Sequence, residues 1–310
     1  MFDTVNFRLW QSEVKEVDFI SETPCYLENV GEHYWGNELA ITGNIGNLKV
    51  SINRNQVKVK DGSLCKWYFG NNFQTLTRRD TKEALEKLSD ALHLPINKAS
   101  VTRLDIATNF IVKQPTEVYL GHLGTLAHTQ RYKHNNGVYY HGRDKVICLY
   151  DKIEEAKAHS EPTPDLYKGK NVLRYEQRYL HRIANALQVE AINGALLYDE
   201  AFYSGLLQRW KQTYLNIQKL NDITLNFEAM RSKKELYQMG VLSLVNMVGG
   251  QTNMIEQINT ASKNGILTRK QALDLRKTVN EVCTLEELTV KNSAISELDN
   301  KVIEAVRFYR

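Results

Sequence analysis

The chain has 310 residues, 42% of them hydrophobic and 25% charged, with a formal net charge of +4. This composition is typical of a globular protein and leaves room for two domains, and it excludes a strongly basic tail. No run approaches the roughly 18 apolar residues of a membrane span. The N-terminus shows no basic leader before an apolar stretch, so we expect no signal peptide. The four cysteines lie far apart, which argues against a zinc site or disulfide framework and favours a reducing cytoplasm.

The first 190 residues predict strands mixed with short helices. Alternation and turn residues predict strands or hairpins at Phe2–Leu9, Leu48–Lys58 (turning at Asn53–Asn55), Leu64–Phe69, Ala99–Phe110, Val138–His141 with Lys145–Tyr150, and Asn171–Tyr179. Helices are expected at Asp80–Leu92 (capped by Asp80), Pro115 to about Leu126, Ile153–His159 and His181–Leu187.

Beyond about residue 190, proline disappears and helical periodicity takes over. Helices are expected at Tyr198–Gln218, Asn226–Met239, Val241–Val248, Met254–Lys263, Thr268–Cys283 and Ser293–Arg310. The sequence therefore predicts an α+β catalytic domain (1–190), with a largely antiparallel sheet flanked by helices, and a helical domain (191–310). The helical domain has basic residues between 269 and 277 that either contact DNA phosphates or form an ordinary solvated helix face.

Three of the expected strands concentrate polar side chains on one parity, and residues two apart on a strand share a face. The segments are Val101–Ala107, Lys145–Lys152 and Val172–Arg178, and the polar residues are Arg103, Asp105, Tyr150, Lys152, Arg174, Glu176 and Arg178. If the strands belong to one sheet, these side chains provide the groups needed to cut a phosphodiester.

Asp105 and Glu176 are the candidate metal ligands. Mg²⁺ and Mn²⁺ prefer oxygen donors, commonly one or two carboxylates completed by water and substrate phosphate. Each acid also follows an arginine by two residues, so either strand taken alone could be a salt-bridged surface strand. The coincidence of two such strands with a Tyr-x-Lys strand favours the metal site.

Tyr150 is the candidate nucleophile, and Lys152 its candidate helper. A phenol with an unperturbed pKa near 10 needs a nearby cation to attack phosphorus at neutral pH. Lys152 would stabilise the phenolate or offset charge on the phosphate. The chain has 16 tyrosines, so a structural role for Tyr150 is the competing interpretation.

The region between residues 131 and 182 is the candidate DNA-binding surface. It holds eleven Lys/Arg against seven Asp/Glu, and a local basic patch fits a polyanion. The expected DNA contacts are Arg143, Lys145, Arg174 and Arg178 in this region, together with Arg103 outside it. His134 and His141 flank the hairpin and approach either the metal or DNA, or have a plain surface or core role. No phosphate-binding loop is present, so we expect no ATP hydrolysis.

The segments Thr102-Arg-Leu-Asp105, Leu149-Tyr-Asp-Lys152 and Leu173-Arg-Tyr-Glu176 resemble the motifs of the filamentous-phage gene II replication initiators. More distantly, they resemble plasmid rolling-circle initiators of the Rep_trans type. The resemblance covers roughly residues 100–180, in the family's order. Plasmid relatives often carry a second acid where this chain has Asn109, which offers a metal at best a carbonyl oxygen. Phage members also lack that acid, which favours the phage-like branch.

The resemblance implies a rolling-circle initiator that nicks one strand of origin DNA, stays joined to the 5′ phosphate through Tyr150 and leaves a 3′ hydroxyl. Lys152 falls on the family's lysine, and Asp105 and Glu176 on its acidic positions. Mg²⁺ or Mn²⁺ is the expected cofactor. The expected partners are duplex and single-stranded origin DNA, with a host helicase and polymerase, in the cytoplasm of a bacterial host. Two alternatives stay open: a metal-dependent nuclease that uses water, and a non-catalytic, origin-binding copy-number regulator.

Overall fold

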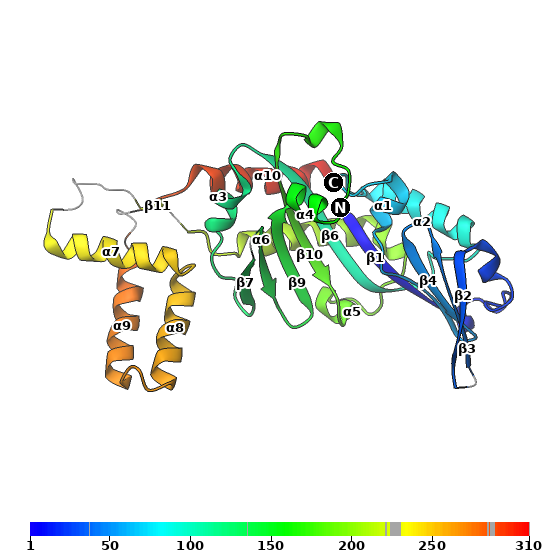
Figure 1. Ribbon diagram of the computed structural model, residues 1–310, viewed down its shortest axis with the longest axis horizontal. Helices are drawn as coiled ribbons and strands as arrows, with labels where there is room; N and C mark the ends of the chain where they lie inside the picture. The colour runs from blue at the N-terminus through cyan, green and yellow to red at the C-terminus, as the bar shows by residue number, and fades with distance from the viewer. Residues whose placement is uncertain are drawn as a thin grey trace.

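A computed structural model of the chain describes residues 1–310 apart from 37, 135, 221, 224–230, 284, 286–288 and 310. Its centre is a ten-stranded antiparallel sheet with the order β2-β3-β4-β5-β1-β6-β10-β9-β8-β7 (Figure 1). The strands are β1 (Phe2–Trp10), β2 (Glu28–Trp35), β3 (Glu38–Ile45), β4 (Leu48–Asn53), β5 (Gln56–Lys60), β6 (Ser100–Val112), β7 (Gln130–His134), β8 (Gly137–His141), β9 (Lys145–Asp151) and β10 (Asn171–Tyr179).

Ten α-helices accompany this sheet in the described part of the chain. They are α1 (Leu64–Phe69), α2 (Arg78–Leu92), α3 (Thr116–Gly121), α4 (Lys152–Ala158), α5 (Ile183–Leu187), α6 (Glu200–Leu215), α7 (Lys233–Met247), α8 (Gln251–Lys263), α9 (Arg269–Val282) and α10 (Ser293–Tyr309). A second, two-stranded sheet pairs β11 (Asp222–Ile223), which precedes α7, with β12 (Thr289–Val290), which precedes α10. The α+β class with a largely antiparallel sheet is therefore confirmed. None of the described helices has the length and apolar character that crossing a membrane requires.

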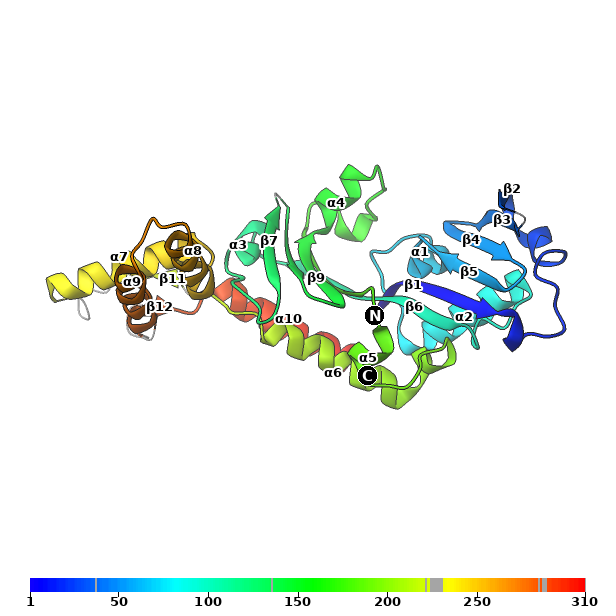
Figure 2. The same cartoon turned by 90° about the horizontal axis from the view of Figure 1, so that it is seen from below.

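The two faces of the sheet have different surroundings. α6 and α10 lie against one face, and α4 lies on the other (Figure 2). The inward residues of β8, β9 and β10, among them Tyr140, Leu149 and Tyr175, join one apolar core with Trp210 of α6 and Leu298 of α10. Alternation along each strand then sends the polar residues of the same strands to the α4 side.

The hydrophobic clusters group the C-terminal helices differently from the expected division near residue 190. α6 and α10 share the core of the sheet, whereas α7, α8 and α9 have small clusters of their own around Leu242 and Val279. Figure 1 shows these three helices at one end of the molecule, beyond β7. The division into domains 1–190 and 191–310 stays a prediction.

Several expected elements differ in the structure. The strand expected at Leu64–Phe69 is helix α1, because the Ser63 side chain accepts a hydrogen bond from the Lys66 N–H and caps it, and Gly70 ends it with φ +81°. The cap of α2 is Thr77, not Asp80; Asp80 completes a reciprocal capping box from the third helical position.

Two helix boundaries also differ from the expected ones. α3 stops at Gly121 rather than near Leu126, in a segment where two glycines weaken the helix. The two helices expected on either side of Gly240 are one, α7, because a single glycine weakens a helix without ending it. Part of the helix expected at Asn226–Met239 lies outside the described residues.

Candidate functional site

Strand register brings the three polar segments onto one face of the sheet. Asp105 on β6 lies directly opposite Arg178 on β10, which places Glu176 at the diagonal position. Diagonal neighbours lie on the order of 7 Å apart. Tyr150 on β9 lies opposite Arg174. Directly paired residues share a face, so both acids and Tyr150 occupy the α4 side of the sheet.

Tyr150 and Glu176 are in direct contact. The Tyr150 hydroxyl donates to Glu176 Oε2 over 3.0 Å. The same oxygen accepts from Arg174 Nε (3.3 Å) and Arg178 Nη2 (3.2 Å), while Oε1 accepts from Arg178 Nε (3.0 Å). Three donors on one carboxylate oxygen fix the orientation of Glu176 and, through it, of the phenol.

The electrostatics of these groups follow from burial and from the guanidiniums. Burial, with the Glu176 carboxylate next, raises the pKa of Tyr150 well above its usual value. Burial alone would also raise the pKa of Glu176, but Arg174 and Arg178 outweigh it and hold that pKa below its usual range. Tyr150 and Glu176 are 7% and 3% exposed, so both groups act in a site of low dielectric.

Asp105 is the less compensated acid. Arg103 donates to both of its carboxylate oxygens, with Nη2 2.6 Å from Oδ2. Burial nevertheless raises the pKa of Asp105 to about 7, and the charge of Glu176 adds to the rise. Two buried carboxylates side by side, one of them poorly neutralised, form a donor set that suits a hard divalent cation.

The site offers two acids rather than a complete protein cage. Among the residues that the structure describes, no group of three or more His, Cys, Asp or Glu has a metal-binding arrangement. Mg²⁺ commonly takes only one or two carboxylates and completes its shell with water and phosphate, so the residues fit such an ion. Arg103 forms an ion pair with Asp105 and Arg178 forms one with Glu176, and both arginine side chains are 31% exposed.

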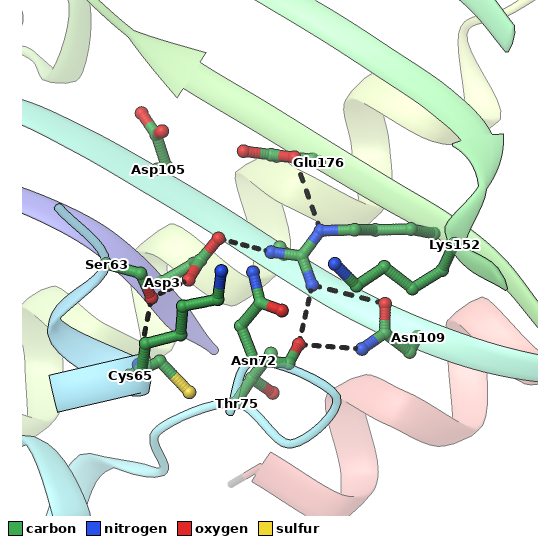
Figure 3. Close-up of polar contacts among 12 residues, drawn as sticks. Asp3, Ser63, Cys65, Asn72, Thr75, Asp105, Asn109, Lys152 and Glu176 are labelled. Atoms are coloured by element: carbon green, nitrogen blue, oxygen red, sulfur yellow. Dashed lines mark hydrogen bonds and ion pairs between the residues drawn. The ribbon is translucent and has the colours of Figure 1, made fainter. Parts of the chain in front are cut away.

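Arg174 has a different surrounding from the one expected of a DNA contact. It is fully buried. Its Nη2 is 2.5 Å from Asp3 Oδ2, and its Nη1 donates to Asn109 Oδ1 and to the Asn72 carbonyl, both at 3.2 Å (Figure 3). These contacts join β1, β6 and β10 around one buried guanidinium. Arg174 therefore holds Glu176 in position from inside the protein.

The two expected lysines lie on different faces of the sheet. Lys152 begins helix α4 instead of continuing β9, so strand parity no longer applies to it. Its ammonium is buried, pairs with Glu155 over 2.5 Å and lies 5.2 Å from the ring centre of Phe73. Lys145 projects to the opposite face, where Nζ is 3.4 Å from Thr213 Oγ1 of α6. Arg174 and Arg178 hydrogen-bond to Glu176 beside Tyr150, and Figure 3 shows Lys152 among the same site residues.

The remaining expected contacts lie near the surface. Arg143 lies in the turn between β8 and β9, and its exposure leaves it available to DNA. His134 and His141 are exposed on β7 and β8. Asp3 is the site residue that sequence reasoning missed. The sequence signal was its parity: Asp3 is a charged residue in the alternating series of strand β1 that otherwise holds the apolar residues Val5, Phe7 and Leu9.

Comparison with known proteins identifies the family. No curated protein matches the chain. The Phage_CRI family model, which describes the N-terminal region of a phage replication-associated protein, matches residues 1–198. The match is more than half of the chain and includes all the site residues above. The chain therefore belongs to the family of filamentous-phage gene II-like replication initiators, which act at replication origins and in general nick DNA.

Proposed function

We propose that this chain initiates rolling-circle replication by nicking one strand of its origin with Tyr150. The proposal extends to Asp105 and Glu176 as ligands of Mg²⁺ or Mn²⁺. The observation that supports it most is the hydrogen bond of 3.0 Å from the Tyr150 hydroxyl to Glu176, on the face that also holds Asp105.

The proposed reaction is an exchange of one phosphate ester for another. The Tyr150 oxygen attacks the phosphorus, the P–O3′ bond breaks, and the proton of the phenol ends on the released 3′ oxygen. Arg174 and Arg178 stabilise negative charge on the phenol oxygen, and Glu176 orients it. A divalent ion held by the two acids would polarise the phosphoryl oxygen.

The covalent product gives the route its advantage. A 5′-phosphotyrosine keeps the energy of the broken linkage, so the 3′ hydroxyl can reseal the strand after a round of replication without ATP. The 3′ hydroxyl is meanwhile a primer for a host polymerase. The proposal accordingly includes a host helicase and polymerase as partners, in the cytoplasm of a bacterial host.

Trapping the adduct tests the proposal. The protein is incubated with supercoiled DNA carrying the origin of the genetic element that encodes it, with Mg²⁺ or Mn²⁺, and run on denaturing gels. We expect a protein–DNA adduct with the wild type and with Tyr139→Phe, and none with Tyr150→Phe. Equal adduct from Tyr150→Phe would show that Tyr150 is not the nucleophile.

The same gels distinguish a second candidate. The burial of Tyr150 favours a nuclease that activates water with the two acids, because water reaches a buried site more easily than a phosphodiester reaches a buried phenol. Nicked DNA without adduct would support that nuclease. Binding without any cutting would instead indicate an origin-binding regulator.

A further inference from the structure

The hairpin of β7 and β8 carries four rings on the same face as the site. Tyr132 on β7 lies directly opposite Tyr139 on β8, and His134 lies opposite Gly137. Gly137 in turn lies opposite Tyr150, and Tyr139 opposite Cys148. Residues two apart share a face, so the rings of Tyr132, His134, Tyr139 and His141 all project to the side of Tyr150.

These rings continue a row that starts at the site. Glu176, Cys148, Tyr139 and Tyr132 are successive cross-strand partners from β10 out to β7. β7 is the last strand of the sheet. With neighbouring strands about 4.8 Å apart, Tyr132 lies roughly 14 Å from the Glu176 position, a distance that a few nucleotides of single strand can span.

Exposure increases along the row, as a path toward solvent requires. Glu176 and Cys148 are buried, at 3% and 0% exposed, Tyr139 is half-buried and Tyr132 is 40% exposed, so exposure rises over the two outer strands. His134 and His141 are exposed. Among the described residues, no hydrogen bond engages the Tyr139 hydroxyl, so hydrogen bonding does not explain its position.

The ring pairs meet edge to face. Tyr132 and His141 have ring centres 5.1 Å apart at 85°, and His134 and Tyr139 have ring centres 5.4 Å apart at 71°. An edge-to-face pair cannot cover the faces of both its rings, so part of the π surface stays available. On the opposite face of the same hairpin, Val138 and Tyr140 are fully buried against the helices.

Gly137 lets Tyr139 lie beside Tyr150. A Cβ at Gly137 would lie 2.9 Å from the Tyr150 Cβ and 3.0 Å from Tyr139 Cε2. Both side chains therefore occupy the space above this glycine. The row of rings is thus continuous with the proposed nucleophile.

We propose that Tyr132 and Tyr139, flanked by His134 and His141, form a stacking platform for bases of single-stranded DNA beside Tyr150. Aromatic rings bind single strands by stacking on bases, which works with any base and fails on a paired duplex. Arg178 and Arg103, on the solvent side of the two acids, are suited to the phosphates of the same strand. This inference rests on the proposed function, since the strand on the platform is the one that Tyr150 cuts.

Binding without chemistry tests the platform separately from nicking. The full chain in EDTA is titrated into a fluorescent dT oligonucleotide and into a duplex of the same length, and affinity is read by anisotropy. Tyr132→Leu and Tyr139→Leu should each weaken single-strand binding about five-fold or more and leave duplex binding unchanged. Tyr132→Phe and Tyr139→Phe keep the ring and should bind as the wild type does.

The matched control is Tyr34→Leu, which removes an exposed tyrosine from β2 at the other edge of the sheet. It should bind both DNAs normally. Wild-type affinity of both Tyr132→Leu and Tyr139→Leu for the single strand would overturn the proposal, as would an equal loss on single strand and duplex.

A second measurement needs no variant. Photocrosslinking of a 5-iododeoxyuridine oligonucleotide to the wild-type protein should map to Tyr132 or Tyr139 by mass spectrometry. Crosslinks that map only to other elements would overturn the platform. Failure of the nicking proposal would show itself differently, as absence of an adduct while single-strand binding still depends on the rings.

Discussion

Replacing Arg174 with methionine should destabilise the protein by about 3 kcal/mol or more. Arg174 is fully buried and pairs with Asp3 and Glu176, whose side chains are only 8% and 3% exposed. Methionine has a similar length but no charge, so both acids would stay buried without this cation. Removing one partner of a buried ion pair costs roughly 3–5 kcal/mol. Glu176 keeps Arg178 and Asp3 keeps its hydrogen bond from Ser63, which favours the lower end of this range.

Urea denaturation followed by circular dichroism measures this cost. The midpoint should fall while the slope of the free energy against urea stays constant, because the folded structure is retained. Arg54→Met is the matched control, since Arg54 is exposed in the turn between β4 and β5. It should change the free energy of unfolding by less than about 0.5 kcal/mol. A cost below about 1 kcal/mol for Arg174→Met would show that Asp3 and Glu176 do not depend on this cation.

A double-mutant cycle shows whether the cost comes from the stranded acids. Asp3→Asn in the Arg174→Met background removes one uncompensated charge. It should therefore cost less there than in the wild type, or even stabilise the variant. Strictly additive free energies would mean that Asp3 and Arg174 do not depend on each other.

Three further predictions concern the acids and the neighbouring glycine. Burial raises the pKa of Asp105 in the folded protein to about 7, from 3.8 in the unfolded chain. Between these pH values the native state holds a proton that the unfolded state has lost. The free energy of unfolding therefore falls as the pH rises from about 4 to 7. In EDTA, Asp105→Asn should therefore stabilise the protein more at pH 8 than at pH 4, by up to a few kcal/mol in thermal or urea unfolding; an equal effect at both values would contradict this. Gly137→Ala should destabilise the protein by about 1–3 kcal/mol and reduce nicking, because the added methyl group meets Tyr150 and Tyr139. Unaltered unfolding and nicking would show that the two rings yield freely. EDTA should abolish adduct formation and Mn²⁺ should restore it, whereas full activity in EDTA would remove the metal from the mechanism.

The position of the site was predictable because strand alternation is a strong signal. Arg103 and Asp105 share a face, and so do Arg174, Glu176 and Arg178, as two-residue spacing requires. The convergence of β6, β9 and β10 followed from the ordered motifs, although spacing alone does not say which strands pair. Tyr150 and Glu176 are in contact because β9 and β10 are neighbours with this register.

The failures had local causes. Lys152 was expected to continue the strand, but Asp151 caps helix α4 by accepting from the Glu154 N–H, so Lys152 is the first residue of that helix. Arg174 was expected to contact DNA. Its burial could not be predicted, because its ion-pair partner Asp3 is 171 residues away in the chain. The row of rings on β7 and β8 was also missed, because it appears only when the pairing of both strands is known.

Mass spectrometry of the residue joined to cleaved origin DNA shows whether Tyr150 is the nucleophile. The covalent species is digested with nuclease and protease, and the modified peptide is sequenced. We expect a nucleotide phosphate on Tyr150 alone. A nucleotide on Tyr139 or on any other residue, with Tyr150 unmodified, would contradict it.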